Sequence, residues 1–318
     1  MTANALYKTP DGYDALMRWY DQTVAALPIP TESRTVETRA GSTHMLVMGN
    51  PDSPQPPLVM FQGFGASAPL WKNQVQDFSR DYRIYAVDVP GHPGKSAPTV
   101  LSLLDDSYAQ WVVDVLDALK LERVHLVGVC LGGWIAMKAA AYAPDRVEKL
   151  VLLSPVGLAA FKVFVRSGVP LIMNFGREND EAGRRLMRMA FTPPGSGLQF
   201  DRDVAKALML VIKHYDIAAL AGFDGSRLSP RDFWIAGRTL MKFVRAESVS
   251  ELQKISAPTL LLVGEHEAIY NPHAAVRRAQ RGIRTLHAEV VPGTGHATIY
   301  DRPDYVNPRV LRFLADGS

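Results

Sequence analysis

The stretch VHLVGVCLGGWIAM, residues 124–137, decides how the rest of the chain is interpreted. Its first half is a short apolar run rich in β-branched residues, which is typical of an inner strand covered on both faces. Its second half continues with small and helix-forming residues as far as Tyr142, which indicates a helix packed closely on a sheet. Gly128 and Gly132 flank Cys130 symmetrically, so the backbone can pass closely on either side of a strained turn. The stretch predicts a strand, a tight turn that projects the Cys130 side chain, and a helix.

This arrangement matches the G-x-S-x-G nucleophile elbow with Cys in place of Ser. The turn puts the thiol at the N-terminus of a helix, where free N–H groups and the helix dipole favour a thiolate and a developing oxyanion. Cys130 is also the only cysteine in 318 residues. A small buried hydrophobic residue is the alternative interpretation, but the two flanking glycines favour a nucleophile. A Cys engineered in place of a catalytic Ser would produce the same pattern.

Composition narrows the class of protein. With 47% hydrophobic residues, a chain of this length can bury a substantial core. The net charge of +3, from 35 basic and 32 acidic residues, is too balanced to indicate binding to nucleic acid or an anionic membrane. A single Cys excludes an intramolecular disulfide and a Cys-based metal site, and we expect neither a metal nor an organic cofactor. The polar N-terminus lacks signal-peptide features, and no apolar run approaches the ~20 residues of a membrane span. We therefore expect a soluble, cytoplasmic protein without a membrane span.

Strands and helices alternate on both sides of residues 124–137. Strands are predicted at residues 57–61, 82–89, 124–129, 147–153, 258–264 and 286–291. Helices are predicted at residues 12–27, at a segment ending near 79, and at 105–120, 131–142, 273–281 and 305–314. Residues 35–49 predict a hairpin of two edge strands. The alternation predicts an α/β fold with a mostly parallel, doubly wound sheet and helices on both faces.

Residues 156–247 interrupt this alternation. The segment has no convincing strand pattern, and Gly and Pro divide it into short helical stretches. It predicts a helical cap inserted into a core made of residues 1–155 and 248–318. Most of its apolar side chains should pack within the cap, and a minority should line a pocket beneath it.

A thiol nucleophile needs a base, and the base needs an acid that orients it. His296 is the predicted base, because it lies in a Gly-rich loop after the last strand, where sites form at the carboxyl ends of parallel strands. Glu267, in the loop after the preceding strand, is the predicted acid, with Glu265 as its competitor. His125, inside a buried strand, is expected to be a hydrogen-bonded core histidine. His92 is expected at the rim of the pocket.

Backbone N–H groups should stabilise the oxyanion. One donor is expected to be Leu131, directly after the nucleophile, and the other Phe64, where Gly63 and Gly65 permit close approach. A tight turn that merely precedes a helix is the alternative interpretation of residues 63–65. Four residues are predicted to bind substrate: Gln62, Gly63, His92 and Trp134.

Over nearly its whole length the chain resembles the α/β-hydrolase superfamily. The matching segments are residues 63–65, 88–96, 128–132, 144–147, 264–267 and 295–296. The order nucleophile, acid, histidine is also that of the superfamily. The resemblance implies Cys130 as nucleophile, His296 as base, Glu267 as acid, and Phe64 and Leu131 as oxyanion donors. The inserted segment looks like the superfamily's helical cap, and the overall likeness is to carboxylesterase-like members.

Three positions depart from the usual pattern of the superfamily. Cys130 replaces Ser, Gln62 stands where His often precedes the oxyanion glycine, and Glu267 stands where Asp is commoner. Cys nucleophiles occur in this superfamily among dienelactone hydrolases and polyhydroxyalkanoate synthases, and the Gly-x-Cys-x-Gly-Gly pattern resembles the box of the latter.

The resemblance predicts a hydrolase of ester, thioester or lactone bonds that forms an acyl-thioenzyme, with a small, largely apolar acyl substrate as its partner. An acyltransferase or cyclase with the same intermediate is one alternative. A lyase or isomerase that forms no acyl-enzyme, or a member of the fold that only binds a ligand, is another. The chain lacks a Gly-x-Gly-x-x-Gly after an early strand, so a Rossmann dehydrogenase is excluded.

Overall fold

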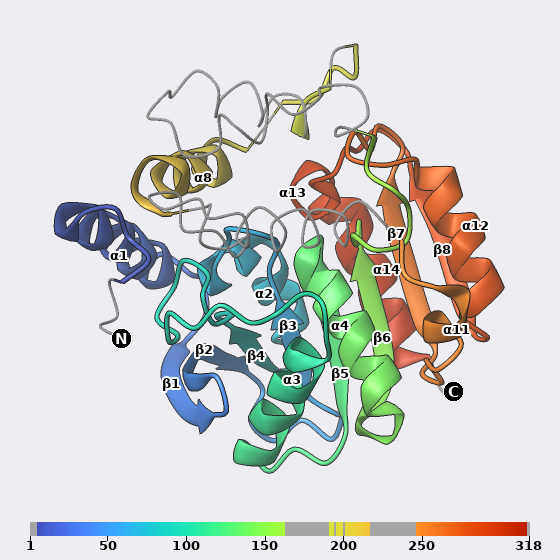
Figure 1. Ribbon diagram of the computed structural model, residues 1–318, viewed down its shortest axis with the longest axis horizontal. Coiled ribbons are helices and arrows are strands. Elements are labelled where there is room, and N and C mark those ends of the chain that lie inside the picture. The colour runs from blue at the N-terminus through green and yellow to red at the C-terminus, as the bar shows by residue number, and fades with distance from the viewer. Residues whose placement is uncertain (1–4, 163–190, 194, 200, 217–245, 317–318) are drawn as a thin grey trace, which may run out of the picture.

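The computed structural model of the chain describes residues 5–162, 191–193, 195–199, 201–216 and 246–316 (Figure 1). The strands are β1 (Thr31–Thr38), β2 (Gly41–Gly49), β3 (Leu58–Phe61), β4 (Arg83–Val87), β5 (Val124–Val129), β6 (Val147–Leu153), β7 (Thr259–Gly264) and β8 (Leu286–Val291). The α-helices are α1 (Pro10–Ala25), α2 (Lys72–Phe78), α3 (Ser107–Ala118), α4 (Leu131–Tyr142), α8 (Arg202–His214), α11 (Val249–Leu252), α12 (Pro272–Gly282), α13 (Thr298–Asp301) and α14 (Pro303–Ala315). Short 3₁₀ turns are η1 (Ala68–Trp71) and η2 (Pro144–Arg146).

The described strands form one sheet in the order β1-β2-β4-β3-β5-β6-β7-β8. Strand β2 is antiparallel to both β1 and β4, and the remaining neighbours are parallel. The α/β prediction with a mostly parallel sheet is therefore confirmed. The prediction that the hairpin supplies two edge strands is wrong for β2, which lies inside the sheet. The reason is visible in its burial: residues 43–48 are all buried, so both faces of β2 are covered.

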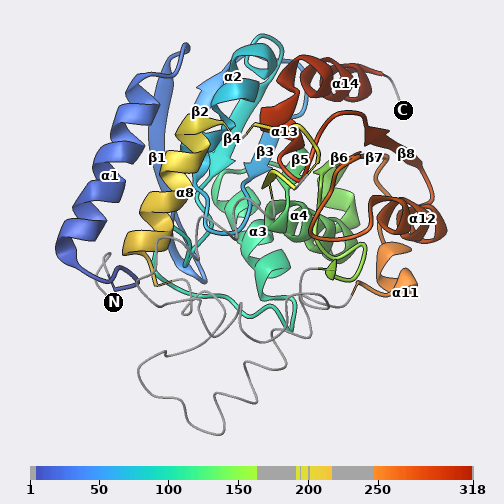
Figure 2. The ribbon, with the colours of Figure 1, turned by 90° about the horizontal axis from the view of Figure 1, so that it is seen from above.

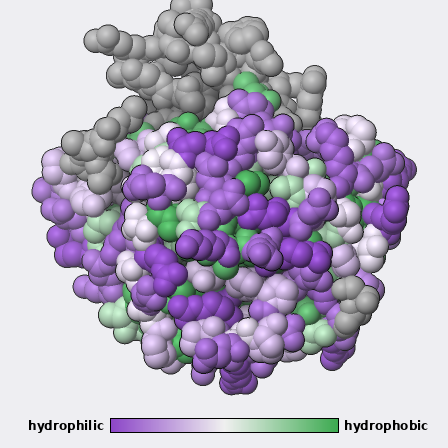
Figure 3. All heavy atoms as spheres, turned by 90° about the horizontal axis from the view of Figure 1, so that it is seen from below, coloured by the Kyte–Doolittle hydropathy of each residue, from purple (hydrophilic) through white to green (hydrophobic). Residues whose placement is uncertain are grey.

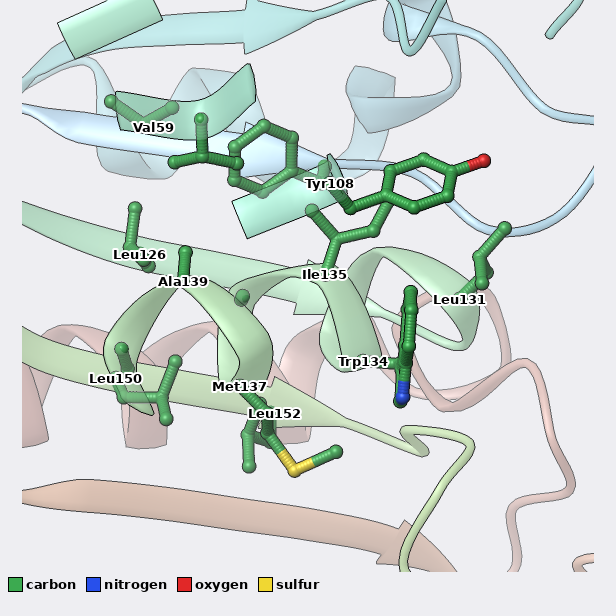
Figure 4. Close-up of a cluster of buried hydrophobic side chains, with 14 of the residues drawn as sticks. Val59, Tyr108, Leu126, Leu131, Trp134, Ile135, Met137, Ala139, Leu150 and Leu152 are labelled. Atoms are coloured by element: carbon green, nitrogen blue, oxygen red, sulfur yellow. The ribbon is translucent and has the colours of Figure 1, made fainter. Parts of the chain in front are cut away.

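Helices cover both faces of the sheet, as Figures 1 and 2 show. One apolar core lies between the sheet and α3, α4, α11 and α12, and the other lies between the sheet and α1, α2, α13 and α14. Alternate residues of β5 divide between them, with Leu126 in the first core and Val127 in the second. Figure 4 shows Leu126, Ala139 and Leu150 at the contact of α4 with β5 and β6. The turn that contains Cys130 therefore follows a strand whose two faces are both packed against helices.

The boundaries of three helices differ from the predictions. Helix α1 begins earlier than predicted, because Pro10 fits the first helical turn and the Thr9 side chain accepts a hydrogen bond from the Gly12 N–H. The helix predicted to end near residue 79 is a 3₁₀ turn followed by α2. The last predicted helix, residues 305–314, is α14, which begins at Pro303, and the short helix α13 that precedes it was not predicted.

Asp88, the residue after β4, accepts hydrogen bonds from residues of four separate segments. Its carboxylate accepts hydrogen bonds from the Tyr20 hydroxyl at 2.9 Å and from His44 Nδ1 at 2.9 Å. It also accepts the backbone N–H groups of Ala68 at 2.9 Å and Lys95 at 3.1 Å. These donors satisfy a buried charge and connect α1, β2 and η1 to the loop of residues 88–96.

Helix α8 is the described helix within the predicted cap. It lies beside α1 in both ribbon views (Figures 1 and 2). The Lys8 N–H donates to the His214 carbonyl at 2.8 Å, and the Tyr215 hydroxyl donates to the Gly91 carbonyl at 2.5 Å. Residues 163–190 and 217–245, most of the predicted cap, lie outside the described residues, so the cap boundaries at 156 and 247 stay a prediction.

The exposed surface carries few large apolar side chains in the described part of the chain. Leu104 and Tyr142 are the exposed ones, at 40% and 48%. The face in Figure 3 is mostly hydrophilic, with apolar residues scattered over its described part. None of the described helices has the length and apolar character needed to cross a membrane.

Candidate active site

Cys130 occupies a strained turn at the junction of β5 and α4. Its φ of 54° is in the left-handed region, which a residue with a side chain rarely adopts. The Cys130 N–H donates to the Leu153 carbonyl at 3.1 Å, and the Cys130 carbonyl accepts the Val156 N–H at 3.1 Å. A Cβ at Gly132 would lie 2.1 Å from the Phe61 carbonyl oxygen, so only glycine fits there. The local sequence thus produces the turn, and the thiol is partly exposed.

The structure brings His296 and Glu267 together. His296 Nδ1 lies 2.7 Å from Glu267 Oε2, and both side chains are buried. The other carboxylate oxygen of Glu267 accepts the Ile269 N–H at 2.9 Å, which fixes its orientation. Glu265, the competitor for this position, is more than half exposed and instead accepts the Gly293 N–H at 3.0 Å. The geometry therefore pairs the imidazole with Glu267 and not with Glu265.

The neighbouring charges set the protonation of His296. Burial alone lowers the pKa of this imidazole, but the Glu267 carboxylate and Cys130 outweigh burial and raise the pKa well above 6.5. Because Nδ1 contacts a carboxylate, it carries a proton. Nε2 is buried and makes no hydrogen bond of ordinary geometry with a described residue. Cys130 lies close enough to contribute to the shift, so the arrangement can take a proton from the thiol.

The turn after β3 lies directly against Cys130. A Cβ at Gly63 would be 3.1 Å from Cys130 Cβ and 3.8 Å from its Sγ. Phe64, the next residue, is the predicted oxyanion donor on this turn. Leu131 is the first residue of α4, so its N–H has no acceptor within the helix. Both predicted donors therefore border the space beside the Cys130 side chain.

His92 lies behind this turn rather than at an open rim. The side chain is buried, and its Nδ1 accepts the Gly65 N–H at 3.3 Å. Its ring meets the Phe64 ring edge-on, with centroids 5.7 Å apart. Burial lowers the pKa of His92 to about 4, which suits an imidazole that must be neutral to accept at Nδ1. These contacts differ from the predicted contact with substrate and indicate that His92 supports the turn.

Trp134 and Gln62 also make internal contacts. The indole Nε1 of Trp134 donates to Glu247 Oε1 at 2.7 Å, where both groups are buried. Its ring packs edge-on against Tyr108 near the start of α4 (Figure 4). The side chain of Gln62 is buried, and its Oε1 accepts the Tyr300 hydroxyl at 3.4 Å. Of the four predicted substrate contacts, Gly63 lies against the Cys130 side chain, and the Trp134 N–H donates to the Cys130 carbonyl at 3.3 Å.

Apolar side chains from the inserted segment cover the site. The ring of Phe191 lies 5.9 Å from the ring of His296, measured between centroids. Val211 of α8 approaches the turn after β3: its Cγ1 would be 3.6 Å from a Cβ on Gly65. Leu198 packs against the backbone just before His296. The described cover of the site is therefore hydrophobic.

The expectation that His125 is a hydrogen-bonded core histidine is wrong. The residue is buried, but neither ring nitrogen bonds to a described residue. Its ring instead packs edge-on against Tyr82, with centroids 5.9 Å apart. Burial, followed by the nearby charges of Lys149 and Arg123, lowers the pKa of His125 to about 4. The strand pattern revealed its burial but not the absence of a partner.

Two residues near the site were not predicted from the sequence. Tyr270 is fully buried, its ring lies edge-on to His296 at 6.3 Å, and burial raises its pKa well above 10. Asp301 accepts the Gly295 N–H at 2.7 Å. Tyr270 follows Glu267 by three positions, and Asp301 follows His296 by five. This proximity to predicted catalytic residues was the sequence signal that could have identified them. Within the described ranges, no cluster of three or more His, Cys, Asp or Glu side chains could hold a metal ion.

Known proteins resemble this chain in sequence and in structure. A model of the alpha/beta hydrolase fold matches residues 56–303. An uncharacterized carboxylesterase of Bacillus subtilis, nap, is 32% identical over 297 residues, which are 93% of this chain and 90% of the relative. The crystal structure of carboxylesterase CesB (YbfK) from Bacillus subtilis has a TM-score of 0.80 and 27% identity, covering 97% of this chain and 100% of its own. The crystal structure of a naproxen esterase from Bacillus subtilis has a TM-score of 0.76 and 30% identity, covering 96% and 99%.

Proposed function

Because the chain belongs to the alpha/beta hydrolase fold family, we propose that it is a carboxylic ester hydrolase that forms an acyl-thioenzyme on Cys130. The observation that carries the proposal is the buried pair of His296 and Glu267, 2.7 Å apart, beside the one cysteine of the chain. Two relatives from Bacillus subtilis, each similar over nine-tenths of the chain, carry carboxylesterase in their names. The family membership and the geometry together support an enzyme rather than a ligand-binding protein.

The reaction follows from the residues around the thiol. Cys130 Sγ attacks the ester carbonyl carbon while its proton passes to His296, and Glu267 stabilises the imidazolium that forms. The Phe64 and Leu131 N–H groups stabilise the oxyanion. The carbon–oxygen bond then breaks, and the alcohol leaves with the proton from His296. Water attacks the thioester, gives a proton to His296, and the carboxylic acid is released as that proton returns to Sγ.

The cover of the site bears on the substrate class. Phe191, Leu198 and Val211 surround the catalytic loop and the oxyanion turn with hydrocarbon. An apolar acyl group gains the burial of its surface there, whereas a charged one would lose hydration without a described partner. We therefore propose esters of small, largely apolar acids as substrates, and the same intermediate could accept thioesters or lactones.

The test is intact mass spectrometry after brief exposure to a panel of p-nitrophenyl esters and acyl thioesters. The parent protein should gain one acyl group and turn over, whereas Cys130→Ala should gain none and His296→Ala should acylate slowly. His273→Gln, at an exposed position on α12, is the matched control and should behave as the parent. Equal acylation of Cys130→Ala, or full turnover after alkylation of the thiol, would contradict the proposal.

Two further outcomes of the same panel identify other activities. If added alcohol or amine captures the acyl group in preference to water, the enzyme is an acyltransferase. If Cys130→Ser turns over faster than the parent, the cysteine is a replacement in a serine hydrolase.

A further inference from the structure

The loop that carries His296 connects β8 to α13 and contacts three carboxylates. Glu265 accepts the Gly293 N–H at 3.0 Å, Asp301 accepts the Gly295 N–H at 2.7 Å, and Glu267 meets His296 Nδ1 at 2.7 Å. Glu265 is more than half exposed, whereas Asp301 is half-buried on the last turn of α13. Asp301 is therefore the better-shielded of the two carboxylates that bind the backbone of this loop.

Gly295 is confined on both sides of its backbone. On one side its N–H binds the Asp301 carboxylate. On the other side its carbonyl lies against Gly264 at the end of β7, where a Cβ would be 2.0 Å from the carbonyl oxygen. A hydrogen bond to a charged acceptor is roughly twice as strong as a neutral one. Because His296 follows Gly295 directly, these two contacts fix the position of the His296 backbone, from which the imidazole extends.

We propose that Asp301 is a positioning residue, which holds the Gly295 amide so that the His296 imidazole stays between Glu267 and Cys130; this inference rests on the proposed function of Cys130. Asp301 acts through Gly295 and makes no contact with the reacting atoms. The Leu198 side chain and the Phe191 carbonyl lie against the same glycine, so the carboxylate accepts its hydrogen bond in a partly water-excluded environment, which strengthens the bond.

The charge of Asp301 gives the proposal a pH dependence. Burial raises the pKa of Asp301 to about 6, although the Gly295 N–H and His296 lower it. The titratable groups that act on it are His296 and Glu267, which are the pair it serves. Above pH 6 the ionised carboxylate holds Gly295 by a charge-assisted bond, and below pH 6 the neutral acid holds it more weakly. The reactivity of Cys130 should therefore fall as Asp301 takes up its proton.

The experiment measures alkylation of Cys130 by iodoacetamide, which needs no ester turnover, from pH 5 to 8. Asp301→Ala should slow alkylation at pH 7 by roughly tenfold or more, because a displacement of about 1 Å can cost up to a hundredfold. Asp301→Asn keeps an acceptor oxygen and should stay within about threefold of the parent. Asp304→Asn, at an exposed position on α14, is the matched control and should alkylate at the parent rate.

Two results would overturn the proposal: Asp301→Ala alkylating at the parent rate, or Asp301→Asn reacting as slowly as Asp301→Ala. If Asp301→Ala does not fold, the pH profile of Asp301→Asn still decides, because it should lack the step near pH 6 that the parent shows. Ester turnover and an NMR titration of His296 are recorded in parallel. A failed esterase proposal leaves the parent without turnover while Asp301→Asn still alters the His296 titration, whereas a failed Asp301 proposal leaves turnover and titration of all variants unchanged.

Discussion

Between pH 7 and pH 5 the protein loses part of its free energy of unfolding, and replacing His125 by Leu should make that loss about 2 kcal/mol smaller. The unfolded chain protonates this histidine near pH 6.5, but burial in β5 lowers the pKa in the folded state to about 4. Between these two values the unfolded state binds more protons, so the free energy of unfolding falls as the pH falls. At pH 5 the pKa difference acts over about 1.5 units, and one unit is worth about 1.4 kcal/mol.

Other groups determine the total that the parent protein should lose between pH 7 and pH 5. His92, with a folded pKa of about 4, costs about another 2 kcal/mol by the same reasoning. Asp301 acts in the opposite direction, because its folded pKa of about 6 lets the folded state take up a proton first, which offsets about 1.3 kcal/mol. From these groups the parent should lose about 3 kcal/mol, and His125→Leu about 1 kcal/mol.

The assay is urea unfolding at pH 7 and pH 5, followed by circular dichroism. Leu has a similar volume to His and removes two ring nitrogens that bond to no described residue, so the variant should not be less stable at pH 7. His273→Gln, on the exposed side of α12, should keep the full acid sensitivity of the parent. If His125→Leu loses as much stability as the parent between the two pH values, the reasoning about His125 is refuted.

Two further predictions concern the site. Glu267→Gln should lower the pKa of His296, as an NMR titration would show, and should lower kcat/KM roughly ten- to hundredfold. Glu265→Gln, at an exposed position, should change kcat/KM by no more than about twofold. Equal losses from both would mean that Glu267 has no special role. Trp134→Phe removes the donor to Glu247 and should lower the free energy of unfolding, measured in urea, by about 2 kcal/mol. KM for small esters should be unchanged. A raised KM with unchanged stability would instead make Trp134 a substrate contact.

The strand, tight turn and helix around Cys130 could be predicted from the local sequence. Gly128, Cys130 and Gly132 specify a tight strand–helix turn because close packing excludes a side chain at the flanking positions. The order of strands and helices followed from hydrophobic periodicity, which reports how many faces of each element are covered. Periodicity did not reveal that β2 is internal, because its second neighbour, β4, comes from a later part of the chain.

The sequence pattern could not predict contacts between segments that are far apart in the chain. The sequence did not predict that His92 accepts a hydrogen bond from the turn after β3 or that Trp134 donates one to residue 247, and the predicted contact of each with substrate stays a prediction. Polar residues near a site can serve the site or support its walls, and the side-chain direction that separates the two depends on packing. The same holds for His125: its burial was predictable, but the lack of a hydrogen bond to any described residue was not.

The sequence by itself determined the strand–turn–helix around Cys130 and made Cys130 and His296 candidates for catalysis, because each depends on residues within one short segment. Only the tertiary structure decided which carboxylate meets the imidazole. Glu265 and Glu267 occupy the same loop, and their partner lies 29 positions beyond Glu267 on another loop. The packing of β7 beside β8 turns one carboxylate inward to His296 and the other outward to Gly293, and a spatial relation of this kind is absent from any local pattern.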